Sequence, residues 1–254
     1  MNNIYLCILG ILIPFIGTSL GSAFVFFLKK SINVVFHKSM IGFAIGVMMA
    51  ASIWSLIIPS VEMAQKSGII SWVPAFVGFF LGILFLIFID KLANKIEKKD
   101  NNKNLNMLIF SVTIHNIPEG MAVGVCFAGF LAGNIGIELM GSMMLAIGIA
   151  IQNIPEGAII SLPLKIEGKS RSKSFLYGVL SGIVEPIAAL LTIILINIVV
   201  PILPYLLSFA AGAMIYVVIE ELVPEMHYKK NSSWGIIGVG IGFSIMMILD
   251  ISLG

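Results

Sequence analysis

The chain has 254 residues, of which 59% are hydrophobic and only 11% are charged, and its mean hydropathy is +1.07. Soluble domains are about one quarter charged, so this composition excludes an ordinary soluble protein and predicts a polytopic membrane protein. The formal net charge of +2 comes from basic residues in short loops and gives no indication of nucleic-acid binding.

Hydrophobic runs predict an all-α fold with eight transmembrane helices. Each run is long enough for a helix to cross a bilayer, which takes about twenty mostly apolar residues. The predicted spans cover residues 4–28, 39–63, 72–92, 107–130, 136–163, 174–197, 201–224 and 234–252. They form a single transmembrane domain over residues 1–254, and the polar stretch 91–106 is expected to be a flexible linker.

The basic residues predict the orientation of the chain. Fourteen of the fifteen Lys and Arg residues lie in odd-numbered loops, and the even-numbered loops contain only Lys66. Because basic residues are retained on the cytoplasmic side, these loops and the 91–106 linker are expected in the cytoplasm and both termini outside. Glu138 and Asp250, near the outer ends of the fifth and eighth spans, are expected to be solvated.

A polar motif interrupts the fourth span. His115, Asn116 and Glu119 lie in an otherwise apolar run, and ionisable groups in a membrane helix usually face a polar cavity or a partner. Residues 115 and 119 are four apart, so they share a helical face with Asn116 beside them. Pro118 has no N–H, which leaves the carbonyl oxygen of Ile114 without its usual donor. These groups on one side of a helix are typical of a cation site.

The fifth span repeats this motif. Residues 152–157 read Gln-Asn-Ile-Pro-Glu-Gly, and residues 115–120 read His-Asn-Ile-Pro-Glu-Gly. Packed face to face, the two helices would bring Glu119 and Glu156 together, and such a pair stays ionised in a low dielectric only if a proton or cation joins it. Glu185 adds a carboxylate inside the sixth span. The candidate ligands are His115, Asn116, Glu119, Gln152, Asn153, Glu156 and Glu185.

The donor groups narrow the choice of cation. Imidazole, carboxylate and amide oxygen suit Zn²⁺, and also Fe²⁺, Mn²⁺ or Cd²⁺, whereas Mg²⁺ needs more oxygen and water and Cu⁺ needs sulfur. Glu119 and Glu156 could bridge two metal ions about 3.5–4 Å apart. The remaining ligands are then shared between the two ions, His115 and Gln152 on one and Asn116, Asn153 and Glu185 on the other.

Two other classes of function stay open on these residues alone. A proton-coupled carrier of an organic solute would use the carboxylates as a proton relay. An intramembrane metalloprotease would need a zinc motif such as H-E-x-x-H, and the three histidines, His37, His115 and His227, do not have that spacing. We therefore expect a carrier rather than an enzyme, with metal as its substrate and no cofactor.

These motifs resemble those of the ZIP (Zrt/Irt-like) metal transporters, in their GufA-like bacterial branch. The resemblance covers nearly the whole chain and includes segments 42–62, 178–191 and 209–227. It implies a homodimer in the plasma (inner) membrane that imports divalent metal, chiefly zinc, through a binuclear site between the fourth and fifth spans. It also implies an inverted repeat of the first three and last three spans around spans four and five, and elevator-like alternating access.

The resemblance further implies a transport pathway and a particular selectivity. The residues that match pathway positions are Ser55, Glu62, Met214, Glu220 and Glu221. Asn153 and Gln152 stand where the family often has Asp and His, so the second metal is expected to bind weakly or to serve regulation. Glu220 stands where His is common, which makes the inner end more acidic. Both departures shift the expected preference towards harder ions.

Overall fold

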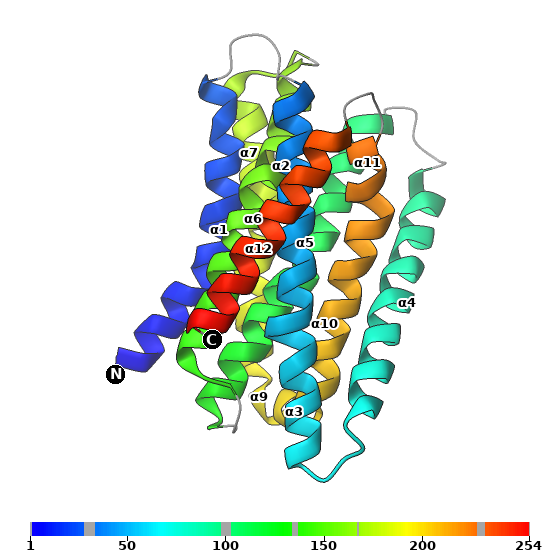
Figure 1. The fold of residues 1–254 in the computed structure, drawn as a ribbon. Helices are drawn as coiled ribbons and strands as arrows, with labels where there is room; N and C mark the ends of the chain where they lie inside the picture. Colours follow the sequence, from blue (N-terminus) through cyan, green and yellow to red (C-terminus); the bar gives the residue numbers. More distant parts are fainter. Residues whose placement is uncertain are drawn as a thin grey trace.

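The computed structural model describes residues 2–27, 34–97, 103–133, 137–166, 168–227 and 232–253. Their regular secondary structure is helical, and the long helices run side by side in one bundle (Figure 1). Both chain termini lie toward the same end of this bundle (Figure 1).

The helices follow the predicted spans in order. Single helices form the first, third, fourth, fifth and eighth: α1 (Asn2–Phe27), α4 (Trp72–Glu97), α5 (Lys103–Leu131), α6 (Leu139–Ile166) and α12 (Ser232–Leu253). The second comprises α2 (Val34–Ala51), the π-helical segment η1 (Ser52–Ile57) and α3 (Ile58–Lys66). The sixth comprises α7 (Arg171–Gly182) and α8 (Val184–Ile194). The seventh comprises α9 (Ile196–Val199), the 3₁₀ turn η2 (Val200–Ile202), α10 (Leu203–Val217), the π-helical segment η3 (Val218–Leu222) and α11 (Val223–His227).

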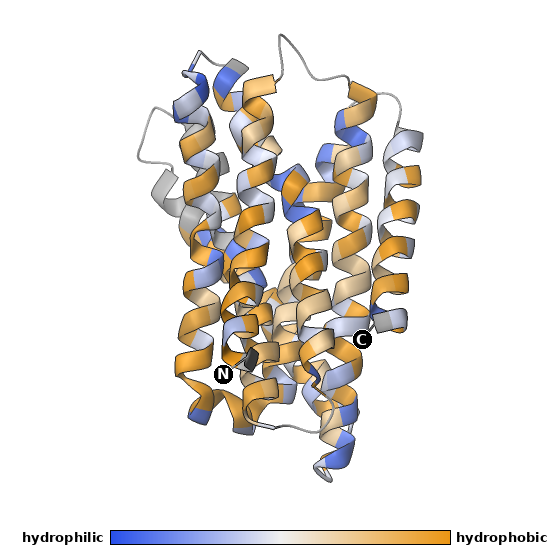
Figure 2. Ribbon diagram, turned by 90° about the vertical axis from the view of Figure 1, so that its left-hand side faces the viewer, coloured by the Kyte–Doolittle hydropathy of each residue, from blue (hydrophilic) through white to orange (hydrophobic). Residues whose placement is uncertain are grey.

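Seven helical segments within the described ranges are long and apolar enough to cross a membrane. The fourth predicted span is represented by a shorter apolar stretch, Asn116–Leu131, within α5. Apolar residues cover the sides of the bundle, and polar residues gather toward its ends (Figure 2). The structure is therefore that of an all-helical, multi-pass membrane protein, and the eighth crossing stays a prediction.

Several helices extend beyond the apolar segments. Because α2 begins at Val34, Lys38 lies in its second turn and is 3% exposed, whereas the sequence placed it in a loop. Likewise α4 continues to Glu97 and α5 begins at Lys103, so helix covers most of the predicted linker 91–106. Lys and Glu are good helix formers, and hydropathy detects only the apolar part of a helix.

Prolines account for the irregular positions in three spans. A proline ring excludes the carbonyl group four residues earlier and supplies no N–H to it. Pro59 and Pro224 come just after η1 and η3, and a π turn accommodates that exclusion. Pro186 stands in the same relation to the end of α7, where the helix breaks at Ile183.

Glycines bring some helices into backbone contact. A Cβ atom added at Gly42 of α2 would lie 1.9 Å from the carbonyl oxygen of Gly235 of α12. A Cβ added at Gly82 of α4 would lie 2.1 Å from that of Phe209 of α10. Helix α10 also packs against η1 and α3, and we refer to α2, α4, α10 and α12 together as the α2 group.

A second unit is built in the same way. A Cβ added at Gly21 of α1 would lie 1.9 Å from the carbonyl oxygen of Ile154 of α6, and one at Gly120 of α5 would lie 2.2 Å from that of Glu185 of α8. Since α7 packs on α1 and α6, the helices α1, α5, α6, α7 and α8 form the α1 group.

Contacts between the two groups differ in kind. Gly148 of α6 meets the side chain of Met246 of α12, and Gly129 of α5 meets the side chain of Leu203 of α10. Among the described glycines, backbone-to-backbone contacts between helices therefore occur only within a group, and side chains fill the space between groups.

Candidate functional site

The two repeated motifs lie on α5 and α6 and meet inside the bundle. Asn116, Glu119, Gln152 and Asn153 are each at most 1% exposed, and Glu156 is partly buried. The side-chain amide of Gln152 donates a hydrogen bond of 2.7 Å from Nε2 to Oε1 of Glu119. The motifs therefore face each other across this bond.

Glu185 of α8 reaches the same region from a third helix. It is fully buried, and Thr18 of α1 donates a hydrogen bond of 2.6 Å from Oγ1 to its Oε1. The amide of Asn153 lies near the carboxyl groups of both Glu119 and Glu185. Helices α1, α5, α6 and α8, all from the α1 group, thus converge on one polar cluster.

The two buried carboxyl groups share one arrangement. In Glu119 and in Glu185, Oε1 accepts a hydrogen bond, while Oε2 has no partner within the described part of the chain. Three amide oxygens of the cluster are buried and unpaired there as well: Asn116 Oδ1, Gln152 Oε1 and Asn153 Oδ1. A buried oxygen without a donor costs about 1–3 kcal/mol, so these five atoms are positions at which a cation could be held.

The glycine that ends each motif positions a neighbouring helix. Gly120 lets the backbone of α8 approach α5 at Glu185, as described above. A Cβ added at Gly157 of α6 would lie 2.1 Å from the carbonyl oxygen of Thr18 of α1. These glycines therefore bring Glu185 and its donor Thr18 to the cluster.

The amide of Asn116 is oriented by α7. Its Nδ2 donates a hydrogen bond of 3.1 Å to the carbonyl oxygen of Ser181, near the break between α7 and α8. That carbonyl lies in the turn that precedes Pro186, where the missing N–H of proline interrupts the helical hydrogen bonds. The bond directs Oδ1 of Asn116 to the opposite side, where it is unpaired among the residues described.

Two predicted ligands are less defined. His115 belongs to α5, but its side chain lies outside the described residues, so its role stays a prediction. Glu156 lies within electrostatic range of Glu119, Glu185 and Glu221. No three His, Cys, Asp or Glu side chains in the described ranges lie close enough together to hold a metal ion, so the bridged two-metal arrangement also stays a prediction.

The sequence analysis missed Thr18. Thr18 and Ser22 are four residues apart on one face of the first span, and Gly17 and Gly21 directly precede them. This pattern of small and hydroxyl residues indicates a tightly packed, polar helix face. It does not show which helix packs there, so the pairing of Thr18 with Glu185 became visible only in the fold.

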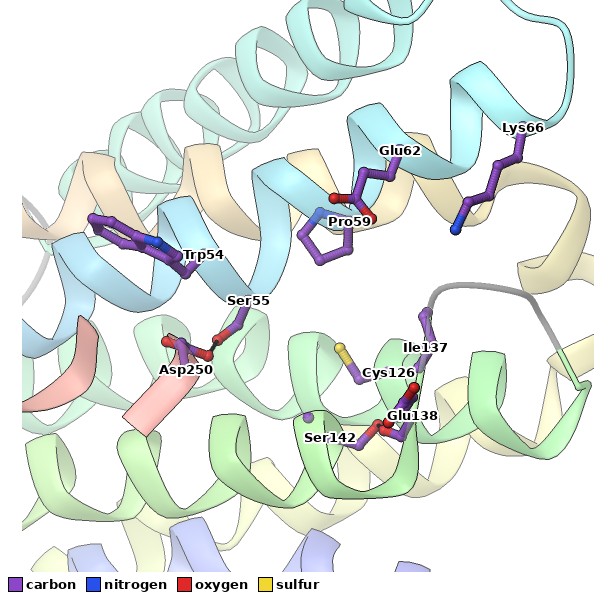
Figure 3. Close-up of a pocket in the computed structure, with 11 residues that line it drawn as sticks. Trp54, Ser55, Pro59, Glu62, Lys66, Cys126, Ile137, Glu138, Ser142 and Asp250 are labelled. Atoms are coloured by element: carbon purple, nitrogen blue, oxygen red, sulfur yellow. Dashed lines mark hydrogen bonds between the residues drawn. The ribbon is translucent and has the colours of Figure 1, made fainter. Parts of the chain in front are cut away.

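A cavity of about 460 Å³ lies at the end of the bundle where α3 ends and α6 begins (Figure 3). Ser55 and Glu62, predicted pathway residues, line it, and Ser55 donates a hydrogen bond of 2.5 Å to Oδ1 of Asp250. Glu138 and Asp250 also line the cavity; Glu138 is exposed, as expected, whereas Asp250 is partly buried and its Oδ2 is enclosed.

The cavity reaches toward the polar cluster along α5. Cys126, which lines it, lies seven residues after Glu119 on the same helix. Seven residues are about two helical turns, so both residues share one face and are about 10 Å apart along the axis. The cavity therefore ends on the helix face that carries the fourth-span motif.

The other predicted pathway residues lie on α10 and η3. Met214 is 1% exposed in the main hydrophobic cluster, so it is a packing residue in this structure. Glu220 is exposed. Glu221 is partly buried, and its carboxyl group lies within electrostatic range of that of Glu156. An electrostatic interaction with a candidate ligand, Glu156, is thus found for Glu221.

Comparison with known proteins identifies the family. Residues 104–250, which include both motifs, match the family model described as ZIP Zinc transporter. The chain is 36% identical to zinc transporter ZIP11 of Xenopus tropicalis, over 97% of this chain and 97% of that protein. It is 33% identical to zinc transporter ZIPB of Bordetella bronchiseptica, over 97% and 81%, and 32% identical to zinc transporter GufA of Myxococcus xanthus, over 79% and 81%. With a match of this extent across the helices that build the polar cluster, the chain belongs to the ZIP zinc transporter family.

Proposed function

We propose that this protein is a secondary carrier that imports divalent transition metal ions, chiefly Zn²⁺, across the plasma membrane. Its relatives are named zinc transporters, which favours a carrier over a protease or an organic-solute transporter. The observation that carries the proposal is the cluster of buried, unpaired oxygen atoms at the meeting point of α5, α6 and α8.

The transported ion binds in this cluster. Glu119 and Glu185 supply negative charge, and each presents its unpaired Oε2 while a donor holds its Oε1. Asn116, Gln152 and Asn153 add amide oxygens, and His115 adds the imidazole that favours transition metals over Mg²⁺. When a second ion binds, Glu119 and Glu156 bridge the two ions. That second ion is held more weakly, because Gln152 and Asn153 carry no charge.

The division into two helix groups supports alternating access as the mechanism. The α1 group, which contains the cluster, moves as a body against the α2 group, in an elevator-like motion. Among the described glycines, none brings the backbone of one group against the backbone of the other, and this supports the division. Metal reaches the cluster through the cavity lined by Ser55 and Glu62, and it leaves past Glu220 and Glu221.

The proposal also includes the orientation of the carrier in the membrane and its assembly. The cavity and both termini face the outside, and the lysine-rich loops, including residues 91–106, face the cytoplasm. The carrier works as a homodimer in the lipid bilayer. Exposed aromatic residues along α4, such as Phe76, Phe80 and Phe88, form a surface suited to lipid or to a second copy.

Uptake of radioactive zinc into proteoliposomes tests the proposal. Wild-type protein is compared with His115→Ala and Glu119→Ala, and Mn²⁺, Fe²⁺ and Cd²⁺ are added as competitors. Glu97→Gln is the matched control, because Glu97 is the last residue of α4, beyond the apolar segment. We expect saturable uptake in the wild type and in the control and its loss in both site variants.

The outcomes separate the candidate functions. If both site variants keep wild-type uptake, the cluster is not the transport site. If folded wild-type protein transports none of these metals, the carboxylates belong to a proton relay for an organic solute instead. The order of the competitors gives the selectivity and tests the expected shift towards harder ions.

A further inference from the structure

Helices α4 and α12 carry the same pattern of three residues. The positions are Gly78, Gly82 and Asp90 in α4, and Gly238, Gly242 and Asp250 in α12. The intervals of four and eight residues are identical, and every pair is 160 residues apart. The chain contains only three Asp residues, and two of them occupy these positions, so a chance match is a poor explanation.

The glycines of the pattern also pack in the same register. A Cβ added at Gly82 would lie 2.1 Å from the carbonyl oxygen of Phe209, and one added at Gly242 would lie 2.1 Å from that of Phe43. Phe43 and Phe209, on α2 and α10, are 166 residues apart. The same interval maps Ser52, the first residue of η1, onto Val218, the first residue of η3. The pairs α2/α12 and α10/α4 are therefore equivalent, down to the start of the π-helical segment.

Each aspartate of the pattern bonds to the partner helix within its π-helical segment or just before it. Asp250 accepts the hydrogen bond from Ser55 within η1. Asp90 accepts a hydrogen bond of 2.6 Å at Oδ2 from the hydroxyl of Tyr216, two residues before η3. In both pairs the carboxylate lies on the glycine-bearing helix, and the hydroxyl lies on the helix that contains the π turn.

The equivalence extends to the residues that face the transport route. The 166-residue interval maps Ser55 onto Glu221. Ser55 lines the cavity at one end of the bundle, and Glu221 lies within electrostatic range of Glu156. A π turn is a local departure from the α-helical hydrogen-bond pattern, and Pro224 removes a backbone donor just after η3. The direction of Glu221 therefore depends on a contact outside the backbone of η3.

We propose that Asp90 is a positioning residue of the carrier: through Tyr216 it holds the turn that enters η3 and so directs Glu221 toward the metal site. Asp250 does the same for η1 through Ser55. The proposal rests on the proposed transport function for its consequence, because Glu221 is then the group that receives the ion from Glu156. The contact itself, and its effect on η3, do not depend on transport.

Cysteine labelling tests the positioning without transport. The Cys7→Ser and Cys126→Ser variant removes both native thiols, and Leu222→Cys in η3 or Ile57→Cys in η1 then adds one reporter. The rate of reaction with N-ethylmaleimide is measured on purified protein. We expect Tyr216→Phe and Asp90→Ala to change the η3 rate about threefold or more and to leave the η1 rate unchanged. Ser55→Ala should do the reverse.

Two variants serve as controls. Asp90→Asn keeps a carbonyl oxygen that can accept the Tyr216 hydroxyl, so it should restore the wild-type labelling rate. Tyr205→Phe removes a hydroxyl from the same helix and keeps the carbonyl oxygen of residue 205, which meets α4 at Gly78. It should leave both reporters unchanged. Equal changes at both reporters in Tyr216→Phe would indicate general loosening and would overturn the proposal, as would no change at the η3 reporter.

Zinc uptake then tests the consequence. Tyr216→Phe with native cysteines should lower the maximal rate about threefold or more and leave KM within about twofold, because the ligands that load the ion are untouched. A raised KM with an unchanged maximal rate would contradict the role of Glu221 in release. If wild-type protein transports no metal at all, the proposed function fails, and the labelling results still decide whether Asp90 positions η3.

Discussion

At the scale of single residues, the polar cluster is organised by hydrogen bonds to one oxygen of each buried carboxylate. Thr18 holds Glu185 and Gln152 holds Glu119, each through Oε1. A ligand whose rotamer is held in place loses less entropy when an ion binds. We therefore expect Thr18 to raise affinity without touching the ion, as hydrogen-bond partners do for the ligands of other metal sites, whereas Gln152 both holds Glu119 and offers its own amide oxygen.

Replacing Thr18 by Val keeps the shape of the side chain and removes the donor to Glu185. We expect KM for zinc uptake to rise about tenfold, the effect of losing one hydrogen bond to a charged group, worth about 1.5 kcal/mol. Thr18→Ser should keep wild-type KM. Thr192→Val is the control, because the hydroxyl of Thr192 bonds to Ala188 on its own helix. An equal rise in KM in both Val variants would show that the donor has no special role.

The sequence predicts this cluster only in part. The repeated motif identifies Asn116, Glu119, Gln152 and Asn153 because polar residues in an apolar run stand out against their neighbours. The contact of Thr18 depends on which helix packs against α8, and hydropathy carries no information on helix neighbours. The packing of Met214 in the hydrophobic core could not be predicted either, because an apolar residue gives the same sequence pattern in a core and along a transport pathway.

At the scale of helices, the glycine of each motif decides how close a neighbouring backbone approaches. Gly120 and Gly157 have no room for a side chain, and the atoms that block it are backbone oxygens of α8 and α1. Backbone in a packed helix moves only together with its whole helix. The motif is thus a packing element as well as a set of ligands.

Gly120→Ala should lower the thermal midpoint in detergent and reduce stability by about 1–3 kcal/mol, because the added methyl group overpacks the contact of α5 with α8. Gly240→Ala is the matched control. Nothing lies within 4 Å of a Cβ added there, and alanine favours helix over glycine by up to about 1 kcal/mol. A midpoint for Gly120→Ala equal to that of the wild type would mean that the two helices separate at little cost.

How well the helices could be predicted depends on their composition. The order of the elements and the all-helical class were predictable, because long apolar runs have few alternatives in a membrane. The breaks at η1, η3 and Ile183 were not predicted, although a proline lies two or three residues beyond each. Proline can be accommodated by a kink, a π turn or a break, and packing decides among them.

At the scale of the whole molecule, the α1 group and the α2 group meet through side chains. Met246 of α12 fills the space at Gly148 of α6 and is fully buried. Methionine is unbranched and flexible, so it can adapt when one surface slides over another. In the proposed mechanism, this contact changes in every transport cycle.

Met246→Ile keeps the volume nearly constant and replaces a flexible side chain by a stiff, β-branched one. We expect the maximal rate of zinc uptake to fall about threefold while KM stays the same, since the ligands are not affected. Met247→Ile is the control, because the next residue points to a different side of α12. A change of KM in Met246→Ile, or equal loss of rate in both variants, would contradict a role in the motion.

The glycine contacts described for the fold have a mechanical consequence. Two helices joined backbone to backbone behave as one stiff beam, because neither can yield without distorting its own hydrogen bonds. Side chains, in contrast, deform by turning about single bonds. A force applied to one helix of such a pair is therefore carried by both helices, whereas the side chains between the α1 group and the α2 group yield to it first. The amino-acid sequence sets that difference in stiffness with a small number of glycines, and it does so before any ion is bound.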